Sequence, residues 1–448
     1  MKKKLQLKPT QTILIGFALI ILIGSLLLNL PLASKSGQSI GFIDAAFTST
    51  SAVCVTGLVV VDTYSHWSLF GQIVILLLIQ IGGLGFMTMA TLFSFMLKRR
   101  ISLKERLIIA ESYNQYTLQG IIKLVRRVLI ATFIIESIGA FLLSLRFIQD
   151  FGVLNGIYKG IFHAVSAFCN AGFDIMGQGQ PFSSLTAYSG DIIVNLIITS
   201  LIIVGGLGFV VWDDIYNAKS YKKLHFHSKI VLFMTGSLLV FGFFSFLLLE
   251  FNNGATLASL SGKDKILVSF FQSVTPRTAG FNTVNFADMR KASVLITMLL
   301  MFIGAAPGST GGGIKITTFG VLLLTAISVI KGREDTEIFK RRISSKIVTR
   351  ALTITLLALL LVFTATVILA SAENITLAEA LFEAISAFAT VGLSLGITTE
   401  LAVVSKITLI ATMFIGRIGI LTVVLALMSR AQDKNASYRY REERIMLG

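Results

Sequence analysis

Four short segments of this chain end in glycine and share one pattern of residue types. They align without a gap, at near-equal intervals, over residues 47–57, 162–172, 270–280 and 382–392. In each segment a phenylalanine precedes the glycine by ten residues. A glycine at such a turn allows backbone angles that other residues avoid, so carbonyl oxygens can point toward one axis. Backbone carbonyls arranged in this way can replace the hydration shell of a monovalent cation.

The residues just before each glycine complete the candidate ligand set. This set consists of Val55, Thr56, Gly57, Asn170, Ala171, Gly172, Thr278, Ala279, Gly280, Thr390, Val391 and Gly392. It contains no Asp or Glu, which argues against a ring for divalent cations and favours weakly held potassium. The alternative is that these glycines merely permit tight turns or close helix packing. The occurrence of four glycines in register weakens that alternative.

One apolar stretch of the chain contains proline and several glycines. It covers residues 301–315, with Pro307 and with glycines at 304, 308 and 311–313. A helix interior loses about 1 kcal/mol for each glycine and about 3 kcal/mol for proline, so we expect the helix to break here. A phosphate-binding loop is a weaker interpretation, because Ile314 separates the glycines from Lys315 and a membrane helix precedes them. The alternative that this segment is a flexible kink with no role in opening or closing a pore also stands.

Each glycine turn needs a framework that holds it within a membrane. We expect a long apolar helix, a short helix of about a dozen residues, the turn, and a second long helix. A dozen helical residues extend about 18 Å and cannot span hydrocarbon of roughly 30 Å, so the short helix must be re-entrant. The first helices are expected at 11–31, 124–147, 228–250 and 349–371, and the second helices at 68–97, 191–212, 292–330 and 404–429.

The fourth repeat shows how the short helix begins. Thr376 and Glu379 fit a capping box, which starts a helix at that point. The carboxyl end of this helix would then point toward Gly392, and its partial negative charge would favour a cation. The same orientation in all four repeats would create a cavity that attracts cations.

The composition identifies an integral membrane protein. Hydrophobic residues make up 54% of the 448 residues and charged residues 14%, with a mean hydropathy of +0.82. Residues 230–249 and 351–370 lack charge, and each run is long enough to cross a bilayer. The apolar run at 13–30 exceeds a signal-peptide core of about 7–15 residues, so we expect a retained first helix.

The net charge of +16 is distributed as in a membrane protein rather than a nucleic-acid-binding protein. Most of the 39 Lys and Arg residues lie at the N-terminus and in residues 98–127, 219–229, 331–350 and 430–444. Basic loops mark the cytoplasmic side, so we predict a multi-pass protein of the cell membrane with both termini cytoplasmic.

The predicted fold is all-α, with four tandem helix–pore loop–helix repeats and eight membrane-spanning helices in pseudo-fourfold symmetry around one pore. The predicted divisions are an N-terminal segment (1–10), repeat one (11–97), a cytoplasmic loop with repeat two (98–212), a loop with repeat three (213–330), a loop with repeat four (331–429) and a C-terminal tail (430–448).

Together these motifs resemble the Ktr/Trk/HKT superfamily of potassium transporters, and the membrane subunits of bacterial Ktr systems most of all. The resemblance rests on residues 52–58, 168–173, 275–281 and 388–393, and residues 81–86 and 413–419 reinforce it. It implies one filter glycine per repeat, with potassium as the transported substrate. Because such a filter is shorter than that of tetrameric potassium channels, we expect weaker discrimination against sodium.

The same resemblance implies that the broken helix forms an intramembrane gate beneath the filter. The implied gate residues are Gly304, Ala305, Ala306, Pro307, Gly308, Ser309, Thr310, Gly311, Gly312, Gly313, Lys315 and Arg417. It also implies a homodimer that rests on a cytosolic ring of nucleotide-binding regulatory subunits. An adenine nucleotide would bind that partner, and no organic cofactor is expected on this chain. The basic segments 331–346 and 430–448 could contact either the partner or anionic lipid.

Arg417 is the charged residue of greatest interest, because a charge inside a membrane segment usually marks function. Its five donors could hold carbonyls freed by the broken helix, and its charge could repel cations. An ion pair that stabilises helix packing is the alternative. Glu136 and Arg277 are expected to stabilise the protein behind the pore. The glycine groups at 82–85 and 205–208 are expected to allow close helix contact.

Other function classes have less support. Cys54 and Cys169 occupy matching places in two repeats and are expected to pack rather than pair, and the histidines show no metal-binding spacing. No nucleophile, metal cluster or acid pair suggests an enzyme, and no nucleic-acid partner is expected. The remaining alternatives are another monovalent-cation transporter or a solute carrier without a gating loop. A carrier with inverted repeats is disfavoured, because the four repeats share one orientation.

Overall fold

The computed structural model describes residues 8–97, 101–112, 119–427, 441 and 443, and these residues are mostly helical. Four long helices are unbroken: α1 (Pro9–Leu28), α7 (Ile121–Phe151), α11 (Phe226–Glu250) and α15 (Ser345–Ala372). Each is long and apolar enough to cross a membrane, and each lies where the first helix of a repeat was predicted. Residues 1–7 of the predicted N-terminal segment and nearly all of the predicted tail at 430–448 lie outside the described residues.

A short pore helix follows each long helix. The pore helices are α2 (Phe42–Val53), α8 (Val153–Phe168), α12 (Gly262–Val274) and α16 (Leu377–Ala389). All four end shortly before a filter glycine. At the start of α16, the Glu379 amide donates to the Thr376 hydroxyl at 3.3 Å, and the Thr376 amide donates to the Glu379 carboxylate at 2.7 Å. The predicted capping box is confirmed.

The second helix of every repeat is broken. The pairs are α4 (Leu69–Leu84) with α5 (Phe86–Met96), α9 (Ile192–Gly206) with α10 (Phe209–Ala218), α13 (Lys291–Phe302) with α14 (Ile316–Ile330), and α17 (Val403–Ile418) with α18 (Ile420–Leu427). The predicted break in repeat three is confirmed, but the expectation of continuous second helices in the other three repeats was wrong. The physical reason is a glycine with positive φ at each break, namely Gly85 (+80°), Gly208 (+91°) and Gly419 (+96°).

The glycines one turn before these breaks bring the second helices against the pore helices. A Cβ atom on Gly82, Gly205 or Gly416 would overlap a backbone carbonyl oxygen near the end of the pore helix, belonging to Val53, Phe168 and Phe388 respectively. The predicted close helix contact at 82–85 and 205–208 is therefore confirmed. The same glycine groups also bend the chain, by 95° between α9 and α10 and between α17 and α18.

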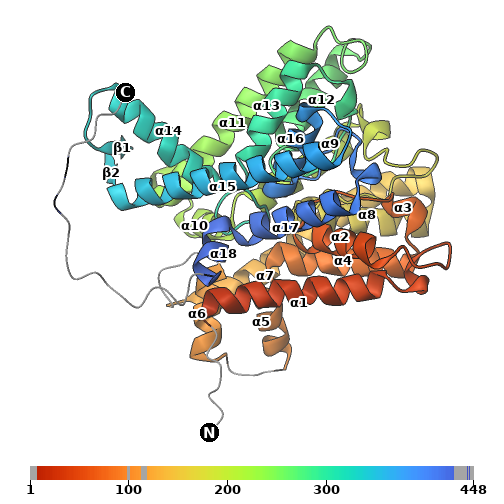
Figure 1. The fold of residues 1–448 in the computed structure, drawn as a ribbon, viewed down its shortest axis with the longest axis horizontal. Helices are drawn as coiled ribbons and strands as arrows, with labels where there is room; N and C mark the ends of the chain where they lie inside the picture. The colour runs from red at the N-terminus through yellow and green to blue at the C-terminus, as the bar shows by residue number, and fades with distance from the viewer. Residues whose placement is uncertain (1–7, 98–100, 113–118, 428–440, 442, 444–448) are drawn as a thin grey trace.

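The pore helices lie toward one end of the molecule, and the basic β-hairpin at 336–343 lies toward the other (Figure 1). In Figure 1 the pore helices α2, α8, α12 and α16 lie toward one end, whereas α5, α6 (Leu103–Ser112), α14 and α18 lie toward the other. The hairpin of β1 (Thr336–Ile338) and β2 (Arg341–Ile343) lies at this second end as well. The remaining short elements are α3 (Thr63–His66) and the 3-10 turns Pro31–Ala33, Thr186–Tyr188, Tyr221–Lys223, Phe286–Asp288 and Thr398–Glu400.

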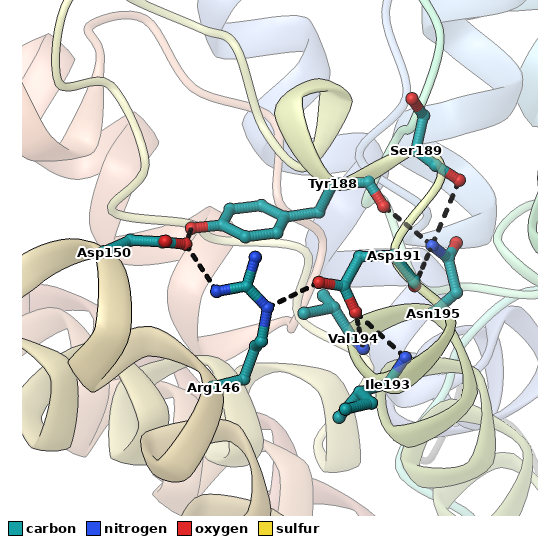
Figure 2. Close-up of polar contacts among 8 residues, drawn as sticks. All are labelled: Arg146, Asp150, Tyr188, Ser189, Asp191, Ile193, Val194 and Asn195. Carbon is teal, nitrogen blue, oxygen red and sulfur yellow. Dashed lines mark hydrogen bonds and ion pairs between the residues drawn. The ribbon is translucent and has the colours of Figure 1, made fainter.

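A polar network fastens the two long helices of repeat two at the end that holds the pore helices (Figure 2). Arg146 of α7 donates to Asp191 at 2.6 Å and to Asp150 at 2.8 Å. Asp191 caps α9 by accepting from the amides of Ile193 and Val194. The Tyr188 hydroxyl donates to Asp150 at 2.7 Å. The connection after the second filter segment is therefore held between α7 and α9.

Candidate functional site

The four predicted filter glycines close into a ring, in chain order. A Cβ atom on any of them would lie 2.6 Å or less from a carbonyl oxygen of the next repeat. The facing oxygens for Gly57, Gly172, Gly280 and Gly392 belong to Ala171, Ala279, Val391 and Thr56. The fourth repeat thus returns to the first. No side chain fits at these positions, so the ring is built from backbone atoms.

All four strands of the ring share one backbone conformation. The glycines have φ angles of +88°, +68°, +81° and +90°, in chain order. The residues two positions earlier are also left-handed: Val55 at +56°, Asn170 at +58°, Thr278 at +66° and Thr390 at +51°. Asparagine tolerates this left-handed region, whereas β-branched residues such as Val55, Thr278 and Thr390 are strained in it. Such strain costs about 1–3 kcal/mol per residue and persists only where the surrounding structure enforces it.

Serines at matching positions in the pore helices supply part of that enforcement. The Thr56 amide donates to the Ser51 carbonyl at 2.7 Å, and the Gly57 amide donates to the Ser51 hydroxyl at 3.0 Å. Ser386 holds the amides of Val391 and Gly392 in the same way.

The other two repeats vary this arrangement. In repeat two the Ser166 carbonyl accepts from Ala171, and the Ser166 hydroxyl donates to Phe173. Repeat three has Val274 at the matching position, and the Thr275 hydroxyl donates to the Phe281 carbonyl instead. Each filter strand is thus bonded to its own pore helix.

Two residues at matching places in the pore helices hold the chain beyond the ring. His163 follows the phenylalanine of repeat two, accepts from the Ile175 amide at 3.4 Å and contacts the Lys159 carbonyl. Glu383 takes the same place in repeat four, where it accepts from the hydroxyls of Ser394 and Thr398. Neither role was predicted, although the repeat alignment places both residues next to the aligned phenylalanine.

One cavity of about 240 Å³ lies against the ring, and all four filter glycines line it. We call it the filter cavity. Its charged lining residues are Asp62 and Asp174, on segments that follow the first and second filter strands. Asp62 accepts from the amides of Ser65 and Phe182 at 2.7 and 2.8 Å. Sequence reasoning missed both acids, which give the cavity a negative charge suited to cations.

Burial raises the pKa of Asp174 to about 6. The negative charge of Asp62 also raises this pKa. The Met176 amide, which donates to the carboxyl at 3.0 Å, and the positive charge of Lys159 both lower it. The carboxyl is therefore neutral below about pH 6 and charged above it.

The segment between α13 and α14, residues 303–315, lies directly against the ring. We call it the α13–α14 loop. A Cβ on Gly311 would overlap the hydroxyl of Thr278, and a Cβ on Gly312 would overlap that of Thr390. The Thr310 hydroxyl donates to the side-chain oxygen of Asn170 at 2.9 Å. The loop therefore touches the strands of repeats two, three and four below their glycines.

The rest of the α13–α14 loop is held by backbone and lysine hydrogen bonds. Ala306 donates to the Gly206 carbonyl at 3.0 Å, and Phe209 donates to Gly308 at 2.8 Å. The Ser309 hydroxyl donates to Ala306 at 2.6 Å. The remaining predicted members pack closely: Ala305 is buried, Gly304 lies against Gly312, Gly313 lies against Ala389 and the Pro307 carbonyl lies against Gly208. Lys315 folds back and donates to the Gly311 carbonyl at 2.7 Å.

Arg417 joins the α13–α14 loop to the second helix of repeat one. Its guanidinium donates to the carbonyls of Thr310 and Gly82, and to that of Gly83 at 3.1 Å. Arg417 occupies the place that Gly83 and Gly206 hold in the matching glycine groups of repeats one and two. Within the described residues its hydrogen bonds all go to backbone carbonyls, which agrees with the expected capture of freed carbonyls rather than with an ion pair.

A second cavity, of about 130 Å³, has the α13–α14 loop in its wall. Its lining includes Gly308, Ser309, Gly311, Lys315 and Arg417. We call it the basic cavity, because Lys315 and Arg417 outnumber Glu111, the acid in its lining. Loop residues thus lie between the ring on one side and a cavity with a net positive lining on the other.

The other predicted polar residues lie behind the ring. Gln80 donates at 3.1 Å to both carboxyl oxygens of Glu136, and Cys169 approaches the same carboxyl at 3.8 Å. Arg277 is buried and donates to the Thr235 hydroxyl at 3.3 Å. Cys54 and Cys169 are both free, as expected. Among the described residues, no group of His, Cys, Asp and Glu could hold a metal ion.

Sequence comparison places this geometry in a known family. The profile of the family TrkH, described as a cation transport protein, matches residues 8–438. The chain belongs to the TrkH family. Its relatives include the potassium/sodium uptake protein NtpJ of Enterococcus hirae, 44% identical over 454 residues that cover 100% of this chain and 99% of that protein. The Ktr system potassium uptake protein B of Bacillus subtilis is 42% identical over 446 residues, with coverage of 100% and 98%.

A solved structure of the same family has the same fold. The crystal structure of the potassium transporter TrkH from Vibrio parahaemolyticus superimposes with a TM-score of 0.73 at 19% identity, covering 95% of this chain and 86% of that one. The resemblance inferred from the four glycine motifs is confirmed, as is the predicted fold. Members of the TrkH family are cation transporters rather than enzymes.

The ring of this TrkH-family protein should not tolerate a methyl group. We expect Gly392→Ala to abolish cation uptake, because its Cβ would overlap the Thr56 carbonyl and its φ of +90° is unfavourable for alanine. Gly236→Ala is the matched control, since Gly236 is helical and, apart from its own helix backbone, no atom of the described residues lies within 4 Å of its Cβ position. The measurement is initial rubidium uptake by equal amounts of folded protein. Uptake by the Gly392 variant at the level of the control would contradict a backbone ring.

Cation entry should depend on the charge of Asp174. Because its pKa is about 6, we expect uptake at limiting rubidium to fall roughly twofold to tenfold as the pH on the filter-cavity side drops from 7.5 to 5. Asp174→Asn should show low uptake at both pH values and a flat profile between them. A pH profile of the variant that matches the unmodified protein would exclude Asp174 as the responsible group.

Proposed function

We propose that this chain carries potassium across the cell membrane through the ring of Gly57, Gly172, Gly280 and Gly392. The single observation that carries the proposal is the closed ring of backbone contacts that lines one negatively charged cavity. Carbonyl oxygens at such a ring bind a dehydrated monovalent cation without the strong hold of carboxylates. Both relatives are named for potassium uptake, and the Enterococcus hirae protein is named for sodium as well.

Sodium would pass with lower preference. The ring offers one glycine per strand, and its four strands differ in sequence, so few well-formed sites are available to reject the smaller ion. The relative from Enterococcus hirae is named a potassium/sodium uptake protein, which fits a modest discrimination. We therefore assign this chain to potassium and rubidium transport with weaker exclusion of sodium than in tetrameric potassium channels.

The α13–α14 loop is the proposed gate. It touches three of the four filter strands on the side opposite the filter cavity, and residues of the loop line the basic cavity. Arg417 holds the Thr310 carbonyl in this position and adds positive charge to the path below the ring. In this proposal the loop in its present position closes the pore. Opening would require the loop to move and Arg417 to release that carbonyl.

Regulation is proposed to come from a separate cytosolic subunit. Two relatives from Bacillus subtilis carry Ktr system names, which imply a transport system of more than one kind of protein. We propose a homodimer of this chain on a ring of nucleotide-binding subunits, with both termini and the basic segments on the cytoplasmic side. The exposed arginines of the β1–β2 hairpin, Arg341 and Arg342, lie at the end where that contact or anionic lipid would be met.

Rubidium uptake into liposomes tests the proposed transport directly. Purified chain in liposomes loaded with potassium chloride should accumulate tracer rubidium, and excess external potassium should suppress this more strongly than equal sodium. Protein-free liposomes and the Gly392→Ala variant are the controls. Equal suppression by both ions would indicate a non-selective cation pathway, and absence of uptake with or without a regulatory subunit would refute the proposal.

Removing the Arg417 guanidinium should favour the open state. Arg417→Gln loses charge-assisted bonds to three carbonyls, worth about 1.5–3 kcal/mol each, so we expect at least a tenfold rise in rubidium flux through the chain alone. Arg350→Gln is the control, because it removes one exposed positive charge near the start of α15, outside the α13–α14 loop. Flux that stays at the level of the unmodified protein would remove Arg417 from the gate.

A further inference from the structure

The α13–α14 loop and the filter ring are joined by a side-chain hydrogen bond. The Thr310 hydroxyl donates to Oδ1 of Asn170 at 2.9 Å and lies 3.3 Å from the Phe168 carbonyl. Asn170 belongs to the second filter strand, two residues before Gly172, and both Asn170 and Thr310 are fully buried. A buried bond of this kind fixes the relative position of the two segments, since without the Thr310 hydroxyl the buried Oδ1 of Asn170 would lack a hydrogen-bond partner among the described residues.

Asn170 also contacts the third filter strand. Its side-chain nitrogen donates to the Arg277 carbonyl at 3.4 Å and lies 3.5 Å from the Thr278 hydroxyl. A Cβ on Gly205 would lie 2.6 Å from Oδ1 of Asn170, so the second helix of repeat two confines this amide. One side chain therefore links two strands of the ring to the loop.

The matching positions in the other repeats do not make this link. Val55 has no polar side-chain atom. The Thr278 hydroxyl lies where a Cβ on Gly311 would be and accepts from Asn170 rather than from the loop. The buried Thr390 hydroxyl beside Gly312 has no hydrogen-bond partner among the described residues. Thr310 itself is held from both sides, because Arg417 donates to its carbonyl while its hydroxyl donates to Asn170.

We propose that Asn170 is a positioning residue that couples the α13–α14 loop to ion discrimination in the ring. The inference deepens the proposed function and rests on it. With the loop in place, Thr310 holds the Asn170 amide, which in turn holds the second and third strands at one separation. When the loop moves away the amide loses this partner, and the ring accepts sodium more readily. Such coupling is reciprocal, so an ion that favours the tightly held ring also stabilises the loop in its present position.

Thr310→Val tests the coupling from the loop, outside the ring itself. This change keeps the side-chain volume but removes the hydroxyl, and Thr310→Ser restores it. Thr297→Val is the matched control, because the buried Thr297 hydroxyl donates to the Ser293 carbonyl of its own helix and, in the described part of the chain, to no other group. The measurement is the ratio of rubidium to sodium uptake into liposomes. Loss of one buried hydrogen bond should lower this ratio about threefold to tenfold in Thr310→Val, while Thr310→Ser and Thr297→Val keep the ratio of the unmodified protein.

A double variant tests whether the two residues act through this one hydrogen bond or whether each change loosens the packing around the ring independently. Asn170→Gly suits the left-handed backbone at this position and removes the same hydrogen bond from the other side. If both changes act through one bond, the combined variant should discriminate no worse than Asn170→Gly alone. Effects that multiply would show that the two residues act independently and would overturn the proposal.

The outcomes distinguish the coupling from the transport function. An unmodified protein that carries no rubidium refutes the proposed function. An unmodified protein that transports rubidium, together with a Thr310→Val variant of unchanged ratio, refutes the coupling alone. If the valine variant does not fold, Thr310→Ala removes the same hydroxyl without crowding the site and is judged by the same ratio.

Discussion

The site depends on the close approach of four backbone strands at positions where no side chain fits. Each ring glycine faces a carbonyl oxygen of the next repeat at a distance that a methyl group would fill. To bring backbone this close within a membrane, every other polar group of the strands must be satisfied locally. Hydroxyl and carbonyl groups of the pore helices bond the filter strands, through serine in repeats one, two and four and through Thr275 in repeat three. The glycine contacts from the second helices allow the close packing.

Much of this arrangement could be predicted from the sequence. The repeated glycines, the apolar first helices, the capping box at Thr376 and the break after α13 all leave local signals of spacing or composition. The continuity of the other second helices was predicted wrongly, because glycines inside an apolar run are tolerated in a helix and those at 82–85 and 205–208 were explained by close helix packing alone. The shared break in these helices can be recognised only when residues 82–85, 205–208 and 416–419 are compared with one another.

Several features that sequence reasoning missed arise from contacts between repeats. Asp62 and Asp174 share a cavity only because the ring is closed, and the bond between Asn170 and Thr310 joins residues far apart in the chain. Such contacts depend on tertiary structure, and neither spacing nor periodicity reports them. Left-handed backbone at Val55, Thr278 and Thr390 was equally unpredictable, because β-branched residues avoid it unless their surroundings impose it.

The fusion of four repeats into one chain has an evolutionary consequence. In a pore made of identical subunits, any codon change alters all positions around the axis at once, and most such changes are too disruptive to survive. In this chain a single codon change alters one of the four repeats around the pore and leaves the other three unchanged. The arginine at 417 in place of a glycine, and the asparagine at 170 among Val and Thr counterparts, are differences that only such a heterogeneous pore can carry. Conductance and regulation can therefore diverge in separate quadrants while the shared axis is preserved.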